Sequence, residues 1–171
     1  QGIWDHIPAP NVNPDGPFRM LASNIAWDDY VGRVAMGKVL SGRGVKGDTI
    51  FLMRKDGTKV RAKISRIFEY AALQTNQTEE AIAGNIVGIA GFEDVDIGET
   101  LTSLEDDTAI PFVDIDPPTV SMEFSVNDSP GAGREGQFVT SRQIRDRLMR
   151  EMKSNISIFV SDTDLAGVFS V

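Results

Sequence analysis

The chain has 171 residues, 41% of them hydrophobic and 25% charged, with a formal net charge of -8. This mix is typical of a globular protein, and the chain has no apolar run long enough to span a membrane. The absence of cysteine excludes disulfides, thiolate metal sites and cysteine nucleophiles. The only histidine, His6, lies in a proline-rich leader, which argues against a Ser-His-Asp site or a multi-histidine metal site.

The acidic charge is unevenly distributed. Residues 19–103 carry eleven basic and eleven acidic side chains, and residues 117–171 carry six basic and seven acidic ones. Residues 104–116 carry five acidic side chains and no basic one. The net charge argues against nonspecific nucleic-acid binding, yet either balanced segment can present a local basic face to RNA.

The first 104 residues are predicted to form a connector and a barrel. Residues 1–17 hold too many prolines for a helix or a sheet interior, so they form a connector. Residues 18–104 show short alternating runs joined by glycine turns, without a helical period, which predicts an antiparallel β-barrel. The expected strands are residues 18–27, 31–40, 49–53, 59–68, 78–82 and 85–90, with a last strand led by Gly98-Glu99-Thr100-Leu101.

Residues 105–118 are acidic and end in two prolines, so they are predicted to be an extended linker. Residues 119–171 then show a half-buried strand at 120–126 and a helix with an apolar stripe, Ile144, Leu148 and Met152. Thr140 and Gln143 form a capping-box pair at the start of that helix.

Two further strands, at 156–160 and 168–171, complete a β-α-β-β unit, which is an incomplete ferredoxin-like α+β domain. A ferredoxin-like sheet runs in the order 4-1-3-2, so the strand at 120–126 should have a bare edge. We therefore expect the second domain to be loosely ordered or to self-associate through this edge.

Two glycine motifs resemble nucleotide-binding loops. Gly32, Gly37 and Lys38 fit a P-loop, but Val39 replaces the hydroxyl residue that binds magnesium, and the strand continues through it. The sequence therefore predicts that this site binds neither GTP nor GDP.

Gly131, Gly133 and Gly136 match the glycine pattern of dinucleotide-binding proteins. The helix cap at Thr140 comes four residues too late for that role, and no further parallel βαβ units follow. The run is interpreted either as a mobile surface loop or as a loop that contacts a partner through Arg134.

The barrel resembles the second domain of translational GTPases, namely elongation factors Tu and G and their relatives. The shared residues are Val31-Gly32-Arg33-Val34, Gly37, Ser41-Gly42, Val45-Lys46-Gly47-Asp48, Ala83-Gly84-Asn85-Ile86-Val87 and Gly98-Glu99-Thr100-Leu101. The second segment resembles the TypA/BipA family more specifically. Its matching runs are Pro118–Met122, Asn127, Ser129-Pro130, Gly133–Gly136 and Phe138–Arg142, with Ile7-Pro8-Ala9-Pro10 in the leader.

The resemblance implies a parent protein that is a cytoplasmic, ribosome-associated GTPase of bacteria or organelles, linked to stress responses and to assembly of the large ribosomal subunit. GTP and magnesium would bind the parent's GTPase domain, which has no counterpart here. The resemblance assigns this chain no catalytic, cofactor-binding or metal-binding residue. It implies docking on the ribosome, with the barrel facing the RNA of the small subunit.

Exposed basic side chains are the candidate contacts to ribosomal RNA. They are Arg33, Lys38, Arg43 and Lys46 in the barrel, and Arg134, Arg142, Arg145 and Lys153 in the second domain. For each, the alternative is an ordinary solvated charge. Two other readings of the chain stay open: a freestanding RNA-binding barrel, which would need exposed aromatic side chains for base stacking, and a fragment of a dinucleotide-binding oxidoreductase.

Overall fold

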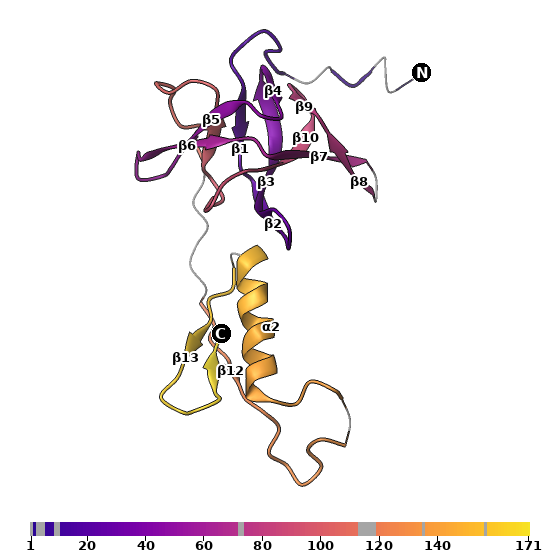
Figure 1. The fold of residues 1–171 in the computed structure, drawn as a ribbon, viewed down its shortest axis with the longest axis vertical. Helices are drawn as coiled ribbons and strands as arrows, with labels where there is room; N and C mark the ends of the chain where they lie inside the picture. Colours follow the sequence, from indigo (N-terminus) through magenta and orange to yellow (C-terminus); the bar gives the residue numbers. More distant parts are fainter. Residues whose placement is uncertain are drawn as a thin grey trace. The chain divides into compact units, whose positions relative to one another are not determined.

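The structure is a computed structural model that describes residues 2, 6–8, 11–71, 74–112, 119–134, 136–155 and 157–171. The chain divides into two compact units, Gln1–Asp114 and Ile115–Val171 (Figure 1). The strands of the first unit are β1 (Arg19–Leu21), β2 (Asn24–Asp28), β3 (Gly32–Ser41), β4 (Arg43–Val45), β5 (Thr49–Met53), β6 (Lys59–Lys63), β7 (Arg66–Ala71), β8 (Gln74–Thr78), β9 (Glu80–Ile82), β10 (Ile86–Ala90) and β11 (Thr100–Thr102).

The predicted antiparallel barrel is confirmed. Nine strands form one sheet in the order β6-β5-β11-β1-β3-β10-β7-β8, with β2 also paired to β3. β4 and β9 form a separate two-stranded ribbon. The long strand β3 organises the unit, because β1 and β2 share one of its edges while β10 pairs along the other.

The single strand expected at residues 18–27 is in fact two strands, β1 and β2. The chain breaks after Leu21, whose carbonyl group lies against Gly37 of β3. A Cβ atom on Gly37 would lie only 1.9 Å from the Leu21 carbonyl oxygen, so the break needs glycine at that position. The motif glycine thus has a packing role in a strand.

The run at residues 59–68 is likewise two strands, β6 and β7, which pair with β5 and β10 respectively. Buried Ile64 lies between them, and its backbone bonds to Asp48 and Gly47 turn the chain from one pairing to the other. The short piece expected at residues 78–82 belongs to two strands, β8 and β9.

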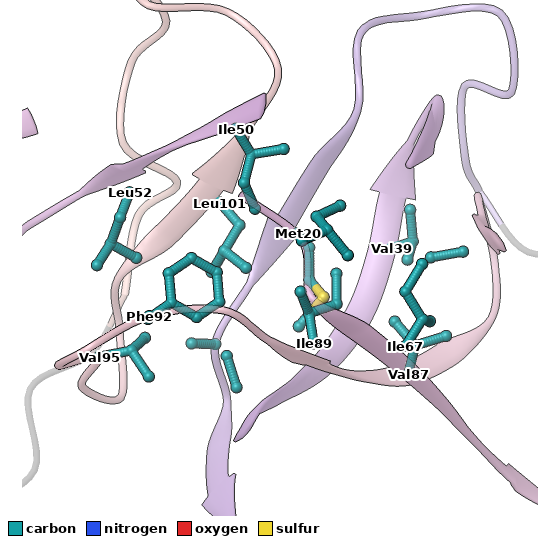
Figure 2. Packing of buried hydrophobic residues seen from close by; sticks show 14 of the residues in the cluster. Met20, Val39, Ile50, Leu52, Ile67, Val87, Ile89, Phe92, Val95 and Leu101 are labelled. Atoms are coloured by element: carbon teal, nitrogen blue, oxygen red, sulfur yellow. The ribbon is translucent and has the colours of Figure 1, made fainter. Parts of the chain in front are cut away.

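The barrel core is a single cluster of apolar side chains. Figure 2 shows Met20, Val39, Ile89 and Leu101 pointing into it from four different strands. Phe18 is also buried, and Asn13 bonds to the end of β3 through the Leu40 carbonyl and the Gly42 amide. The later part of the predicted connector therefore lies against the barrel.

The acidic stretch predicted to be a linker is partly a cover for the barrel. Asp107 pairs with Arg19 at 2.9 Å and accepts a bond from the Thr102 hydroxyl. Phe112 packs against the core, beneath the Lys55 ammonium, which is 5.0 Å from the ring centroid. Residues 105–112 thus differ from a free linker because their acids and apolar groups have partners on β1 and β11. Residues 113–118 lie outside the described residues.

The second unit contains β12 (Glu123–Phe124), α2 (Ser141–Ser154), β13 (Ser161–Asp162) and β14 (Phe169–Ser170). The sheet order β12-β14-β13 is the 1-3-2 part of the expected ferredoxin-like order. The capping box is confirmed, since the Thr140 hydroxyl accepts from the Gln143 amide and the Gln143 side chain accepts from the Thr140 amide.

The prediction of a half-buried strand at residues 120–126 is wrong. Only Glu123 and Phe124 are assigned to a strand, and Val120 and Met122 are 75% and 62% exposed. Phe124 is 40% exposed although its ladder partner Phe169 is only 4% exposed, so the edge strand of the sheet is less covered than the middle strand.

The strand expected at residues 156–160 is displaced to Ser161–Asp162; Ile156 lies outside the described residues. The apolar stripe of α2 is half-buried, and Met152 accepts a bond from the Val160 amide through its sulfur. Across the described residues, no helix is both long enough and apolar enough to cross a bilayer.

Candidate functional site

Two of the candidate cations, Arg43 and Lys46, lie on or next to β4 of the β4–β9 ribbon. Arg43 and Lys46 are both exposed, as expected, but each is already paired. Arg43 forms an ion pair with Glu80, and the Lys46 ammonium lies 3.1 Å from a carboxylate oxygen of Glu79. Exposed pairs of this kind contribute little to stability and can exchange partners readily.

Arg33 lies at the start of β3 and is held by the loop that follows Phe92. Its guanidinium lies 2.7 Å from Asp94 and 3.1 Å from Asp96, and it also donates to the Val95 carbonyl. Two carboxylates on one guanidinium leave it poorly suited to attract an anion, so Arg33 has a structural role in this loop.

Lys38 is exposed on β3 opposite Ile86, and no carboxylate of the described residues pairs with it. It lies between Arg33 and Arg43, which sit near opposite ends of the strand. At about 3.3 Å per residue, Arg33 and Ser41 are roughly 26 Å apart along β3. The structure therefore does not bring the four barrel candidates into one cluster.

In the second unit, two candidates are paired through the helix. Arg145 forms a two-point contact with Asp162 of β13 at 3.3 Å and 3.2 Å, and this bond raises the pKa of the arginine further. Arg142 lies 4.0 Å from Asp146, one turn along. Lys153 is exposed in the last turn of α2.

Arg134 is exposed in the glycine loop and lines a hollow with Phe138 and Ile144. This loop consists of turns, and the helix begins only after the cap at Thr140. The hollow therefore lacks a helix start within the glycine run, which the dinucleotide interpretation needs.

The P-loop interpretation fails on geometry. Gly37 and Lys38 lie in the middle of β3, and Val39 is fully buried in the core, where no hydroxyl could reach a phosphate-bound magnesium ion. Among the described residues, no group of three or more acidic or histidine side chains is arranged to hold a metal ion. The glycine-lysine motif of β3 therefore does not have the geometry of a P-loop.

Sequence reasoning missed a row of basic side chains on the outer face of β6 and the start of β7. Its members are Lys59, Arg61, Lys63 and Arg66, and all four are exposed. The alternation of these residues with apolar ones serves in the sequence as a strand signal. The same pattern, lysine or arginine at every second position, is also a signal for a charged face.

Known proteins match this chain along its whole length. Residues 32–102, which run from β3 to β11, match the family described as elongation factor Tu domain 2. The large ribosomal subunit assembly factor BipA of Synechocystis is 42% identical over 171 residues, covering 100% of this chain and 29% of that protein. The protein of the same name from Escherichia coli K12 is 39% identical over 171 residues, covering 100% of this chain and 28% of its own.

This chain belongs to the TypA/BipA family. It spans less than a third of the length of the BipA relatives it matches. A crystal structure of a protein from Thermus thermophilus covers 91% of this chain at a TM-score of 0.60 and 20% identity, with 22% of that protein matched. At that identity the likeness supports the fold alone. Both Arg43 and Lys46 and the basic row on β6 and β7 lie inside the domain 2 match.

Proposed function

We propose that this chain is a non-catalytic, ribosome-docking part of a BipA-type GTPase. The observation that carries the proposal is the identity of about 40% over the whole chain to proteins named large ribosomal subunit assembly factors. GTP hydrolysis with magnesium, a role in stress responses and a cytoplasmic location belong to the whole parent protein in this proposal. The chain itself contributes surfaces that hold ribosomal RNA.

The β4–β9 ribbon is the first such surface. Arg43 and Lys46 are exposed on a short ribbon, and each faces one glutamate, Glu80 and Glu79 respectively. An RNA phosphate can take the place of either glutamate, because an exposed ion pair is worth at most about 1 kcal/mol. Such contacts give affinity without reading the base sequence.

Co-sedimentation of the intact parent protein with ribosomes, over a range of salt concentrations, tests whether the β4–β9 ribbon contacts ribosomal RNA. The variant R43Q/K46Q should bind more weakly and with a flatter salt dependence, because each lost phosphate contact removes roughly 0.7 to 0.9 from the slope. The matched variant E79Q/E80Q frees the same two cations and should bind at least as well as the wild type. If R43Q/K46Q co-sediments with ribosomes as well as the wild type does at every salt concentration, this role is excluded.

A further inference from the structure

The row of basic side chains on β6 and β7 has fewer ion pairs than most other cations of the barrel. Lys59 pairs with Asp106 at 3.3 Å, but that carboxylate is 99% exposed. No residue of the described chain forms an ion pair with Arg61, Lys63 or Arg66. By contrast, Arg19, Arg33, Arg43 and Lys46 are each bound to a carboxylate.

Three further carboxylates lie near the row without forming an ion pair with it. Asp28 lies within electrostatic reach of Arg66, and Glu93 and Asp94 line a hollow together with Arg61. Asp94 is paired with Arg33. The four cations of the row are exposed to solvent, and these acids offset part of their charge.

The row also has an aromatic neighbour in register. Phe51 of β5 lies directly opposite Arg61 of β6, and Thr49 lies opposite Lys63. Their inward neighbours Val60 and Ala62 pack against the core, so Arg61 and Lys63 point outward. Phe51 is half-buried, so part of this side chain is accessible at the position opposite Arg61. Cations beside an aromatic ring are the combination that single-stranded nucleic acid binds.

Protection of a sheet edge does not account for the whole row. β6 ends the sheet, and charged side chains on such a strand do prevent pairing with other chains. Arg66, however, lies at the start of β7, opposite Ala90 of β10 and one residue before the pairing of β7 with β8 begins at Ile67. The row therefore continues past the edge strand β6 to the start of an internal strand.

We propose that Lys59, Arg61, Lys63 and Arg66 form a binding surface for the phosphate backbone of single-stranded RNA, with Phe51 available to stack against a base. This surface is separate from the β4–β9 ribbon. The inference rests on the proposed function in one respect, namely that the RNA is ribosomal.

Binding of this chain to a fluorescent oligouridylate, measured by anisotropy over a salt series, tests the surface without ribosomes. The variant R61Q/K63Q should lose about tenfold or more in affinity at 0.1 M salt, and its salt slope should fall by about 1.4, because each single-strand phosphate contact contributes about 0.7. F51L should weaken binding severalfold with an unchanged slope. The control R147Q/R150Q removes two exposed helix cations and should match the wild type.

Four outcomes decide the matter. Loss of RNA binding in R61Q/K63Q, with an unchanged thermal unfolding midpoint, supports the surface. Binding by R61Q/K63Q equal to that of the control overturns it, as does a wild-type chain that does not bind the oligonucleotide. If R61Q/K63Q binds the oligonucleotide normally yet fails to sediment with ribosomes, the row contacts a protein and the inference is wrong. The proposed function fails by a different result, namely an intact parent protein that does not sediment with ribosomes.

Discussion

Glu99 is a buried acid in the turn before β11, and it should make the stability of the barrel depend on pH. Its carboxylate accepts a bond of 2.9 Å from the Asp96 amide. Burial raises the pKa of Glu99 above the ordinary 4.5, and the Asp96 and Asp94 carboxylates add to the rise. The Asp96 amide and the Arg54 guanidinium oppose it. The fold therefore favours the protonated acid, whose contribution is complete below pH 4.5 and is lost as pH rises through the higher folded pKa.

The variant E99Q keeps an oxygen for the Asp96 amide and removes the charge. We expect its thermal unfolding midpoint, relative to the wild type, to rise as pH increases from 4.5 through the higher folded pKa of Glu99. A difference for E99Q that does not change with pH would mean that the raised pKa has no effect on folding.

Exposure of single residues could be predicted from the sequence, but their partners could not. Arg43 and Lys46, in and after the glycine-rich turn, are exposed as predicted. Their glutamates lie more than thirty positions away, and the pairing of β4 with β9 brings them close. A local pattern carries no information about such a contact, and the pairing of Arg33 with Asp94 was missed for the same reason.

At the scale of elements, the start of α2 depends on a reciprocal pair of bonds between Thr140 and Gln143. T140A removes the hydroxyl that accepts from the Gln143 amide, so we expect the second unit to lose about 1 kcal/mol of stability. T140S keeps that oxygen and should stay close to the wild type. Denaturant unfolding followed by far-ultraviolet circular dichroism measures the difference, and equal midpoints for the alanine and serine variants would contradict the role of the cap.

Regular elements were predictable where local sequence decides the structure. The strand β5 has the expected bounds, and the capping box places the start of α2 as predicted. The strand at 120–126 was not predictable, because its apolar alternation implies a buried face only if something covers it. In the second unit, Phe169 is buried while Met122 is exposed.

At the scale of the whole molecule, the two units differ in how much apolar surface they bury. Val160 and Phe169 are the buried hydrophobic residues identified in the described part of the second unit, whereas the first has the whole cluster around Met20 and Leu101. We predict that backbone amides of α2 and β12 exchange with deuterium much faster than those of β3, because local opening is easy where few apolar contacts are broken.

The same unit has a reason to self-associate. β12 lies at an edge of its described sheet, next to exposed Val120 and Met122. If a second copy covers this edge, protection of the β12 amides should rise with protein concentration, together with the mass measured by sedimentation. Slow, concentration-independent exchange in β12 and α2, in a monomer, would show that the second unit is stable by itself.

Residues 105–112 have a consequence for where the chain can be cut. The Thr100 hydroxyl accepts from the Ile110 amide, and the Thr102 hydroxyl donates to Asp107. A protein shortened after Ser103 would leave both threonines without these partners and would uncover the backbone at Gly98, against which the Phe112 ring packs. A protease that separates the two units without damaging the first must therefore cleave beyond Phe112. An isolated barrel for binding studies should keep residues 105–112.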